Sequence, residues 1–144
     1  MAPGSLASGF GRRFAARIPA MATPPKNLSF GRRLGFAVAG LAHAVRGERS
    51  LQTQLAALVL VVLVLAYLRP PAVWWALASL CAALVLAAEL FNTAIEHLAD
   101  HVHPQLHPQI RIVKDCAAAA VLCAAIGAIG VAVAFVVELA GHWR

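Results

Sequence analysis

The chain has 144 residues, of which 61% are hydrophobic and only 12% are charged, and its mean hydropathy is +0.77. A soluble domain is typically about 45–50% apolar and about 25% charged, so this composition excludes a soluble single domain and predicts a membrane protein. The net charge of +6 does not indicate nucleic-acid binding, because eight of the twelve Lys and Arg lie between Arg12 and Arg49, before the first long apolar run. A basic segment in that place is typical of an anionic cytoplasmic membrane face.

The first part of the chain divides into a leader and an amphipathic segment. Residues 1–28 hold four of the eight prolines and no sustained apolar pattern, which predicts a disordered leader. Over residues 29–47, apolar side chains recur every three or four positions, and Arg32 and Arg33 lie among them. This pattern predicts an amphipathic helix in the membrane interface, with Ser29 as its N-cap.

Three long apolar runs follow the interfacial helix. We expect transmembrane helices over about residues 51–68, 72–94 and 115–138, because about 20 apolar residues are needed to cross a bilayer. The remaining four prolines stand between these runs and never within one, as helix-breaking requires. The positive-inside rule places the N-terminus and the loop from about 97 to 114 in the cytoplasm. The predicted fold is all-α, with three transmembrane helices preceded by an interfacial helix.

Small side chains recur along the third predicted span, where alanines stand at positions 120, 124, 128 and 132. Small residues let helix backbones approach closely within a membrane. Because three helices bury little surface by themselves, we expect several copies of the chain to associate into a helical bundle. The alternative is that alanine is simply abundant here.

The chain has only six acidic residues, and one helix face carries three of them together with an asparagine. The second span runs on without a break, and within an arc of about 80° it carries Glu89, Asn92, Glu96 and Asp100. A carboxylate within a membrane-spanning segment is costly. Glu89 is therefore a candidate general base for a hydroxyl group, whereas the alternative is that it only marks the end of the span. The three aligned polar residues favour the functional interpretation.

Glu48 lies where the interfacial helix meets the first span, on the side of the membrane expected for Glu96. Together the two carboxylates would suit Mg²⁺, which takes one or two protein carboxylates and leaves other positions for water and phosphate oxygens. Such a site would recruit a nucleotide polyphosphate. The alternative is an ordinary ion pair of Glu48 with Arg46 or Arg49.

Two further candidates open the third span. Lys114 would bind a phosphate group, and Asp115 would cap the helix or orient its neighbour. The alternative is that a basic residue at this helix end follows the positive-inside rule. The sixth acid, Glu138, lies near the other end of the third span and has no proposed role.

Four of the six histidines lie between the second and third spans: His97, His101, His103 and His107. His97 and His101 have the i, i+4 spacing of a metal-binding pair. This spacing leaves open an alternative function of a different class, namely that of a small metal-binding or transport membrane protein. Because these side chains lie about 60–140° away from the acidic face, we expect them not to share its site.

The segment Glu89-Leu-Phe-Asn-Thr-Ala-Ile-Glu96-x-x-x-Asp100, followed by His107-Pro108 and Lys114-Asp115-x-Ala-Ala-Ala-Ala-Val121, resembles the bacterial integral-membrane diacylglycerol kinase and undecaprenol kinase family. The resemblance covers roughly residues 29–140, within a membrane domain of residues 29–144. It implies ATP-dependent phosphorylation of a lipid hydroxyl at the cytoplasmic membrane face, by a homotrimer with sites built from neighbouring subunits. The expected acceptor is diacylglycerol, with undecaprenol as the alternative.

The resemblance also implies a role for individual residues. Glu89 corresponds to the catalytic base, Glu48 and Glu96 to the Mg²⁺ ligands, and Asn92 and Asp100 to supporting positions of the active site. The residues implied to contact ATP or its Mg²⁺ are Glu48, Glu96, Gln105, Leu106, His107, Lys114 and Asp115. Catalysis by such a site is mostly positioning and charge neutralisation around an in-line transfer.

The sequence departs from the family pattern in two places. Ser29 stands where an arginine is expected near the start of the interfacial helix, which leaves Arg32 or Arg33 as substitutes. The stretch after Glu48, Arg-Ser-Leu-Gln-Thr-Gln54, does not closely match either branch of the family. These departures bear on which lipid the protein accepts.

Overall fold

The computed structural model describes residues 28–105 and 107–141. The predicted leader up to residue 27, the candidate Leu106 and the C-terminal residues 142–144 lie outside the described residues. The chain divides into two units, residues 1–35 and residues 36–144, with the boundary inside the first described helix.

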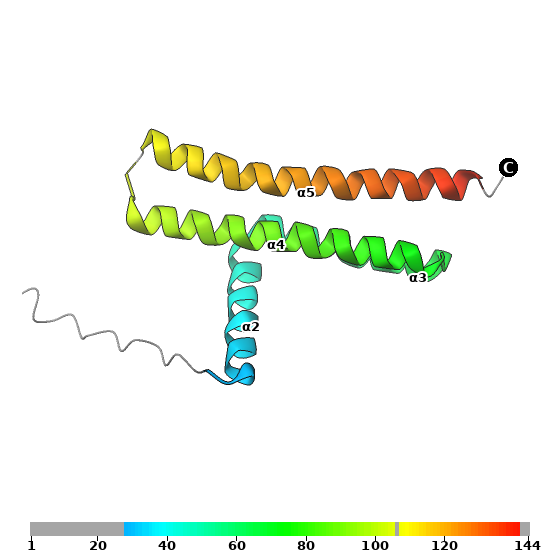
Figure 1. The fold of residues 1–144 in the computed structure, drawn as a ribbon, viewed down its shortest axis with the longest axis horizontal. Coiled ribbons are helices and arrows are strands. Elements are labelled where there is room, and N and C mark those ends of the chain that lie inside the picture. The colour runs from blue at the N-terminus through cyan, green and yellow to red at the C-terminus, as the bar shows by residue number, and fades with distance from the viewer. Residues whose placement is uncertain (1–27, 106, 142–144) are drawn as a thin grey trace, which may run out of the picture. The chain divides into compact units, whose positions relative to one another are not determined.

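Four helices make up the described part of the chain (Figure 1). They are α2 (Phe30–Gly47), α3 (Arg49–Leu68), α4 (Ala72–Val102) and α5 (Pro108–Gly141). The last three are each long and apolar enough to cross a membrane. The predicted fold class, three spans preceded by a shorter helix, is confirmed, while the homotrimer stays a prediction.

The helix ends follow from local chemistry. The carbonyl oxygen of Ser29 accepts the N–H groups of Arg32 and Arg33 at 3.0 and 3.2 Å, so Ser29 stands at the N-cap position, directly before the first residue of α2. At the end of α3, Arg69 adopts a left-handed conformation (φ 50°, ψ 49°) and donates its N–H to the carbonyl of Leu65 at 2.8 Å. The two prolines that follow cannot continue the helix, so the chain turns here into α4.

Helices α4 and α5 are longer than the predicted spans. No proline or glycine interrupts residues 72–102, so α4 continues eight residues past the predicted end at residue 94. Helix α5 begins at Pro108, since proline is favoured in the first turn, where its missing N–H is not needed. A helix of 31 residues is about 46 Å long, more than the roughly 30 Å of the hydrocarbon core, so part of α4 extends beyond the apolar layer.

Helices α4 and α5 run antiparallel along their length, and α3 packs against α4 more loosely (Figure 1). Because α4 is the only described helix that α5 contacts, the covered side chains of α5 show the face that packs on α4. This face contains Lys114, Ala117, Val121, Ala124, Ala128, Val131, Phe135 and Leu139. Of the predicted alanine stripe, positions 124 and 128 belong to this face, and positions 120 and 132 are exposed.

The core of a single chain is small. In the most apolar stretch of 18 residues within each span, at most 11% of the residues are buried. Large side chains such as Leu60 and Val137 are 62% and 66% exposed. The apolar faces of α3 and α5 are therefore left for lipid or for other copies of the chain.

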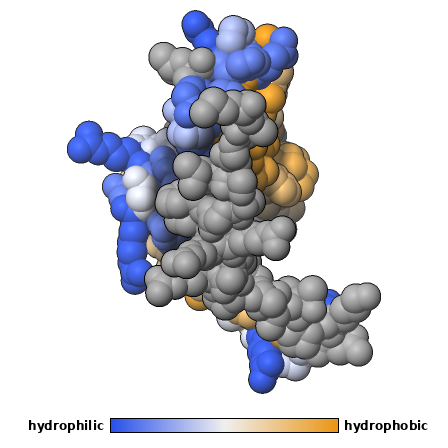
Figure 2. All heavy atoms as spheres, turned by 90° about the vertical axis from the view of Figure 1, so that its left-hand side faces the viewer, coloured by the Kyte–Doolittle hydropathy of each residue, from blue (hydrophilic) through white to orange (hydrophobic). Residues whose placement is uncertain are grey.

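We name the two ends of the packed helices by their connections. The turn end is where residues 69–71 join α3 to α4, and the loop end is where residues 103–107 join α4 to α5. Figure 2 faces the loop end and shows hydrophilic side chains gathered there, with hydrophobic side chains along one flank.

Candidate functional site

Glu89 is buried inside an apolar helix. Its exposed fraction is 3%, and among the described residues only it and Thr93 are polar and buried. Glu89 lies 13 residues before the last residue of α4, which is about 20 Å from the loop end of that helix. A carboxylate at such a depth in a membrane-spanning helix is costly, and this favours a functional role.

One turn further along α4, Asn92 and Glu96 are joined by a hydrogen bond. The Asn92 Nδ2 donates to Glu96 Oε1 at 3.0 Å, which fixes the direction of the Glu96 carboxylate. The other end of the Asn92 amide, Oδ1, is buried and has no hydrogen-bond partner within the described part of the chain. The predicted acidic face of α4 is therefore present as one continuous stretch of helix.

Glu48 lies at the junction of α2 and α3, where it occupies the N-cap position of α3 with an extended backbone (φ −105°, ψ 115°). Its side chain makes no capping hydrogen bond, so the carboxylate is available for other partners. Its Oε1 lies 3.9 Å from Nε2 of His97. Because His97 directly follows Glu96, the structure brings Glu48 to the stretch of α4 that carries Glu96.

That the histidines do not share the site of the acidic face stays a prediction, but the structure places one of them, His97, beside Glu48. Its side chain is about 100° from that of Glu96 around α4, but the start of α3 lies against that neighbouring face, and Glu48 reaches it. The His97 ring also lies 5.9 Å from the ring of His43 on α2. The alternative ion pairs of Glu48 with Arg46 or Arg49 do not occur among the described residues.

Lys114 and Asp100 connect α5 to α4 at the loop end. The Nζ of Lys114 lies 2.6 Å from Oδ1 of Asp100, and the two side chains are 33% and 64% exposed. The cation predicted to bind a phosphate group is therefore paired with the last acid of the α4 face. This pair joins the two helices next to their connection.

Asp115 pairs with a residue outside the candidates predicted from the sequence. Its Oδ2 lies 3.7 Å from Nε of Arg111, one turn earlier on α5, and both side chains are exposed. Lys114 and Asp115 thus have different partners on different sides of the helix. The i, i+4 spacing of Arg111 and Asp115 in the sequence is the pattern from which this ion pair could have been predicted. Exposed pairs of this kind contribute little to stability.

The connection between α4 and α5 is folded around its histidines. The Nδ1 of His107 accepts the N–H of Gln109 at 3.2 Å and so caps the start of α5. The rings of His103 and His107 are 5.2 Å apart, and Nδ1 of His103 lies 3.2 Å from the carbonyl oxygen of Gln105. His107 therefore stands about two helical turns before Lys114 along α5.

The donor chemistry of the site suits Mg²⁺ better than a transition metal. Within residues 28–105 and 107–141, no three His, Cys, Asp or Glu side chains gather closely enough to hold a metal ion. Mg²⁺ does not require such a group, because it takes one or two protein carboxylates together with water and phosphate oxygens. Glu48 and Glu96 supply two carboxylates on neighbouring segments, whereas the nearest partners of His97 are Glu48 and His43 and not His101.

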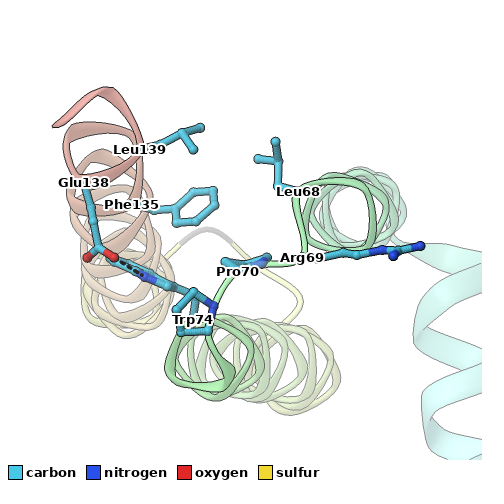
Figure 3. A pocket seen from close by; sticks show the side chains of 8 residues that line it. Leu68, Arg69, Pro70, Trp74, Phe135, Glu138 and Leu139 are labelled. Carbon is cyan, nitrogen blue, oxygen red and sulfur yellow. Dashed lines mark hydrogen bonds between the residues drawn. The ribbon is translucent and has the colours of Figure 1, made fainter. Parts of the chain in front are cut away.

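The sixth acid lies at the other end of the molecule. The indole Nε1 of Trp74 donates a hydrogen bond to Oε1 of Glu138 at 3.2 Å, and the Trp74 and Phe135 rings are 5.0 Å apart (Figure 3). A cavity of about 390 Å³ opens beside them, between the turn after α3 and the last part of α5. This cavity is at the turn end, so it is separate from the polar face of α4.

The solvent exposure of the polar side chains on α4 increases toward the loop end. Glu89 is buried at one end and Asp100 is exposed at the other, about 16 Å away along the helix axis. Such an arrangement can bring a membrane-embedded hydroxyl group and a charged, water-soluble co-substrate to one site.

Residues 35–136 match the family model described as prokaryotic diacylglycerol kinase. A diacylglycerol kinase of Synechocystis sp. is 37% identical to this chain over 95 residues, which is 65% of this chain and 54% of the relative. The chain therefore spans about half the length of the curated relative that it matches. The matched residues 35–136 include every candidate position from Glu48 to Asp115.

Proposed function

Because the chain belongs to the prokaryotic diacylglycerol kinase family, we propose that it transfers the γ-phosphoryl group of ATP to the hydroxyl group of diacylglycerol, which gives phosphatidic acid. The observation that carries this proposal is the burial of Glu89, only 3% exposed, within an apolar helix. The name of the Synechocystis relative supports diacylglycerol as the acceptor. Neither comparison favours undecaprenol, the alternative acceptor.

In this proposal Glu89 is the general base. It accepts the hydroxyl proton of the lipid as the hydroxyl oxygen forms a bond to the γ-phosphorus of ATP. The bond between that phosphorus and the bridging oxygen breaks on the opposite side, and ADP leaves with the electron pair. The depth of Glu89 in α4 fits a substrate whose hydroxyl lies near the apolar layer.

The charged groups nearer the loop end would hold the nucleotide. Glu48 and Glu96 would bind Mg²⁺, with the Asn92 amide holding the Glu96 carboxylate in place. When bound, the ion neutralises negative charge on the phosphate groups. The remaining nucleotide contacts in this proposal come from Gln105, Leu106, His107, Lys114 and Asp115.

The proposal also implies an orientation of the chain in the membrane. ATP is a cytoplasmic solute, so the loop end, which carries the charged residues, faces the cytoplasm of the cell, and the basic N-terminal segment lies on the same side of the membrane. The exposed apolar faces of α3 and α5 support association of copies of the chain, for which we propose a homotrimer in the bacterial cytoplasmic membrane.

The test is a transfer assay in mixed micelles with labelled ATP, Mg²⁺ and diacylglycerol. We expect labelled phosphatidic acid from the unaltered protein and a fall in kcat of about 10²–10⁴-fold in Glu89→Gln, which removes the base but keeps the shape. Glu138→Gln, at the turn end, is the matched control and should retain the unaltered rate. No transfer by the unaltered protein, or full transfer by Glu89→Gln, would contradict the proposal.

A further inference from the structure

The corner between α2 and α3 is closed by a side chain outside the candidate site. The amide Nε2 of Gln52, in the first turn of α3, donates a hydrogen bond to the carbonyl oxygen of Val45, in the last turn of α2, at 2.8 Å. The last four carbonyl groups of a helix have no partner within that helix. Gln52 therefore satisfies one of these groups in α2, and it does so across the residue at the corner, Glu48.

Gln52 also holds Glu48 through the main chain. The N–H of Gln52 donates to the carbonyl oxygen of Glu48 at 3.2 Å, and the N–H of Glu48 donates to the carbonyl oxygen of Ala44 at 2.8 Å. The backbone of Glu48 is thus bonded to the helix on either side of it. Of the three bonds, only the one from the Gln52 side chain to Val45 joins α3 directly to α2.

The first turn of α3 is a fixed base for this contact. Leu51, next to Gln52, is fully buried, and α3 packs on α4. Residues 36–47 of α2, in contrast, do not pack along any other described helix. They approach α4 through the ring of His43, which lies 5.9 Å from that of His97. The angle between α2 and α3 is therefore set mainly at the corner itself.

That angle decides where the Glu48 carboxylate lies. Its Oε1 is 3.9 Å from Nε2 of His97, the neighbour of Glu96 in the sequence. A ligand oxygen must lie about 2.0–2.1 Å from Mg²⁺ in nearly octahedral geometry, so a small rotation at the corner removes the carboxylate from the ion. We propose that Gln52 is a positioning residue, which through its bond to Val45 holds Glu48 where it can bind the same Mg²⁺ as Glu96. This inference rests on the proposed function, in which Glu48 is a Mg²⁺ ligand.

The experiment measures metal binding with and without this hydrogen bond. Gln52→Met keeps the length of the side chain and removes the donor, and because Gln52 is exposed, the buried side chains stay in place. Thr53→Val is the matched control, since Thr53 is also exposed and its hydroxyl bonds the carbonyl oxygen of Arg49 within its own helix. Phosphoryl transfer is measured in mixed micelles against Mg²⁺ at fixed ATP. Binding of Mn²⁺ with a non-hydrolysable ATP analogue is measured by electron paramagnetic resonance, which does not depend on turnover.

We expect Gln52→Met to raise both the Mg²⁺ concentration for half-maximal rate and the dissociation constant of Mn²⁺ by about 3- to 10-fold, the usual worth of one hydrogen bond. The kcat at saturating Mg²⁺ should stay that of the unaltered protein, because the bound ion then holds Glu48 in place. Thr53→Val should match the unaltered protein in every measurement. Unaltered metal dependence in Gln52→Met, or a fall in kcat that saturating Mg²⁺ does not restore, would overturn the inference.

A double variant separates positioning from a general effect on the structure. In the Glu48→Gln background, Gln52→Met should not raise the dissociation constant of Mn²⁺ further, because the charged ligand that Gln52 positions is no longer there. Additive increases in the double variant would show that Gln52 acts by a route other than Glu48, and the inference would then be wrong.

These outcomes are distinct from a failure of the proposed function. If the unaltered protein phosphorylates no lipid, the kinase proposal fails, while Mn²⁺ binding still decides the role of Gln52. If Glu48→Gln binds Mn²⁺ as the unaltered protein does, Glu48 is not a ligand and this inference falls with that assignment. If Glu48→Gln weakens metal binding and Gln52→Met does not, the metal site stands and only the role of Gln52 falls.

Discussion

Lys114 and Asp100 form an ion pair of 2.6 Å between α5 and α4, directly beside the connection of the two helices. In the proposed mechanism, the same lysine binds a phosphate group of ATP. In that mechanism, Asp100 would hold the cation on the α4 side until the nucleotide binds. The Lys114 side chain is only 33% exposed, so this contact reduces the freedom that nucleotide binding would otherwise have to remove.

The first prediction concerns this pair. Lys114→Met should raise the KM for ATP by about 10-fold or more, the usual worth of a charge-assisted hydrogen bond, with the KM for lipid unchanged. Asp100→Asn should raise the KM for ATP less, because Lys114 remains but is no longer held. In the Lys114→Met background, Asp100→Asn should have no further effect. Additive effects of the two substitutions in steady-state kinetics would show that the residues act independently.

The second prediction concerns Mg²⁺. Glu48→Gln and Glu96→Gln should each raise the Mg²⁺ concentration for half-maximal rate about 10-fold or more, because each removes a charged oxygen ligand. Asn92→Ala should produce a smaller shift in the same direction, since it releases the Glu96 carboxylate from its 3.0 Å hydrogen bond. Activity measured against Mg²⁺ at fixed ATP checks this, with Glu138→Gln as control. An unaltered Mg²⁺ dependence in Glu96→Gln would remove that residue from the metal site.

The third prediction concerns the turn end. Trp74→Phe keeps an aromatic ring against Phe135 but loses the donor to Glu138, so it should lower the free energy of unfolding by about 1 kcal/mol. That corresponds to a fall in Tm of about 2–4 °C, measured in detergent micelles. The kcat and both KM values should not change, because Trp74 lies far from the polar face of α4. A kinetic change without a loss of stability would connect this end of the molecule to the reaction.

Much of the site could be predicted from the sequence because it lies on one helix. Helical periodicity alone places Glu89, Asn92 and Glu96 on one face, and the absence of proline and glycine keeps that face continuous to Val102. The helix boundaries beyond the apolar runs were less predictable. The polar ends of α4 and α5 continue into water, where hydropathy no longer distinguishes helix from loop.

The contacts between helices could not be predicted in the same way. The approach of His97 to Glu48 and the bond from Trp74 to Glu138 join residues that are 49 and 64 positions apart. They depend on how α3 and α5 are rotated and shifted against α4, which the periodicity of a single helix does not determine. The hydrogen bond from Gln52 to Val45 also becomes visible only when the corner between α2 and α3 is known.

The last prediction follows from the contact of Glu48 with His97 within one chain. Because His97 is next to Glu96, the two proposed Mg²⁺ ligands of a site come from the same subunit, even if other residues come from a neighbour. At the Mg²⁺ concentration that is half-maximal for the unaltered protein, Glu48→Gln and Glu96→Gln subunits that are unfolded together and refolded as mixed oligomers should therefore be no more active than either variant alone. Mixtures of Glu48→Gln with Glu89→Gln serve as the comparison, since they regain activity if Glu89 acts across the subunit interface. Recovery of kinase activity in the Glu48→Gln and Glu96→Gln mixture would show that the two ligands come from different subunits.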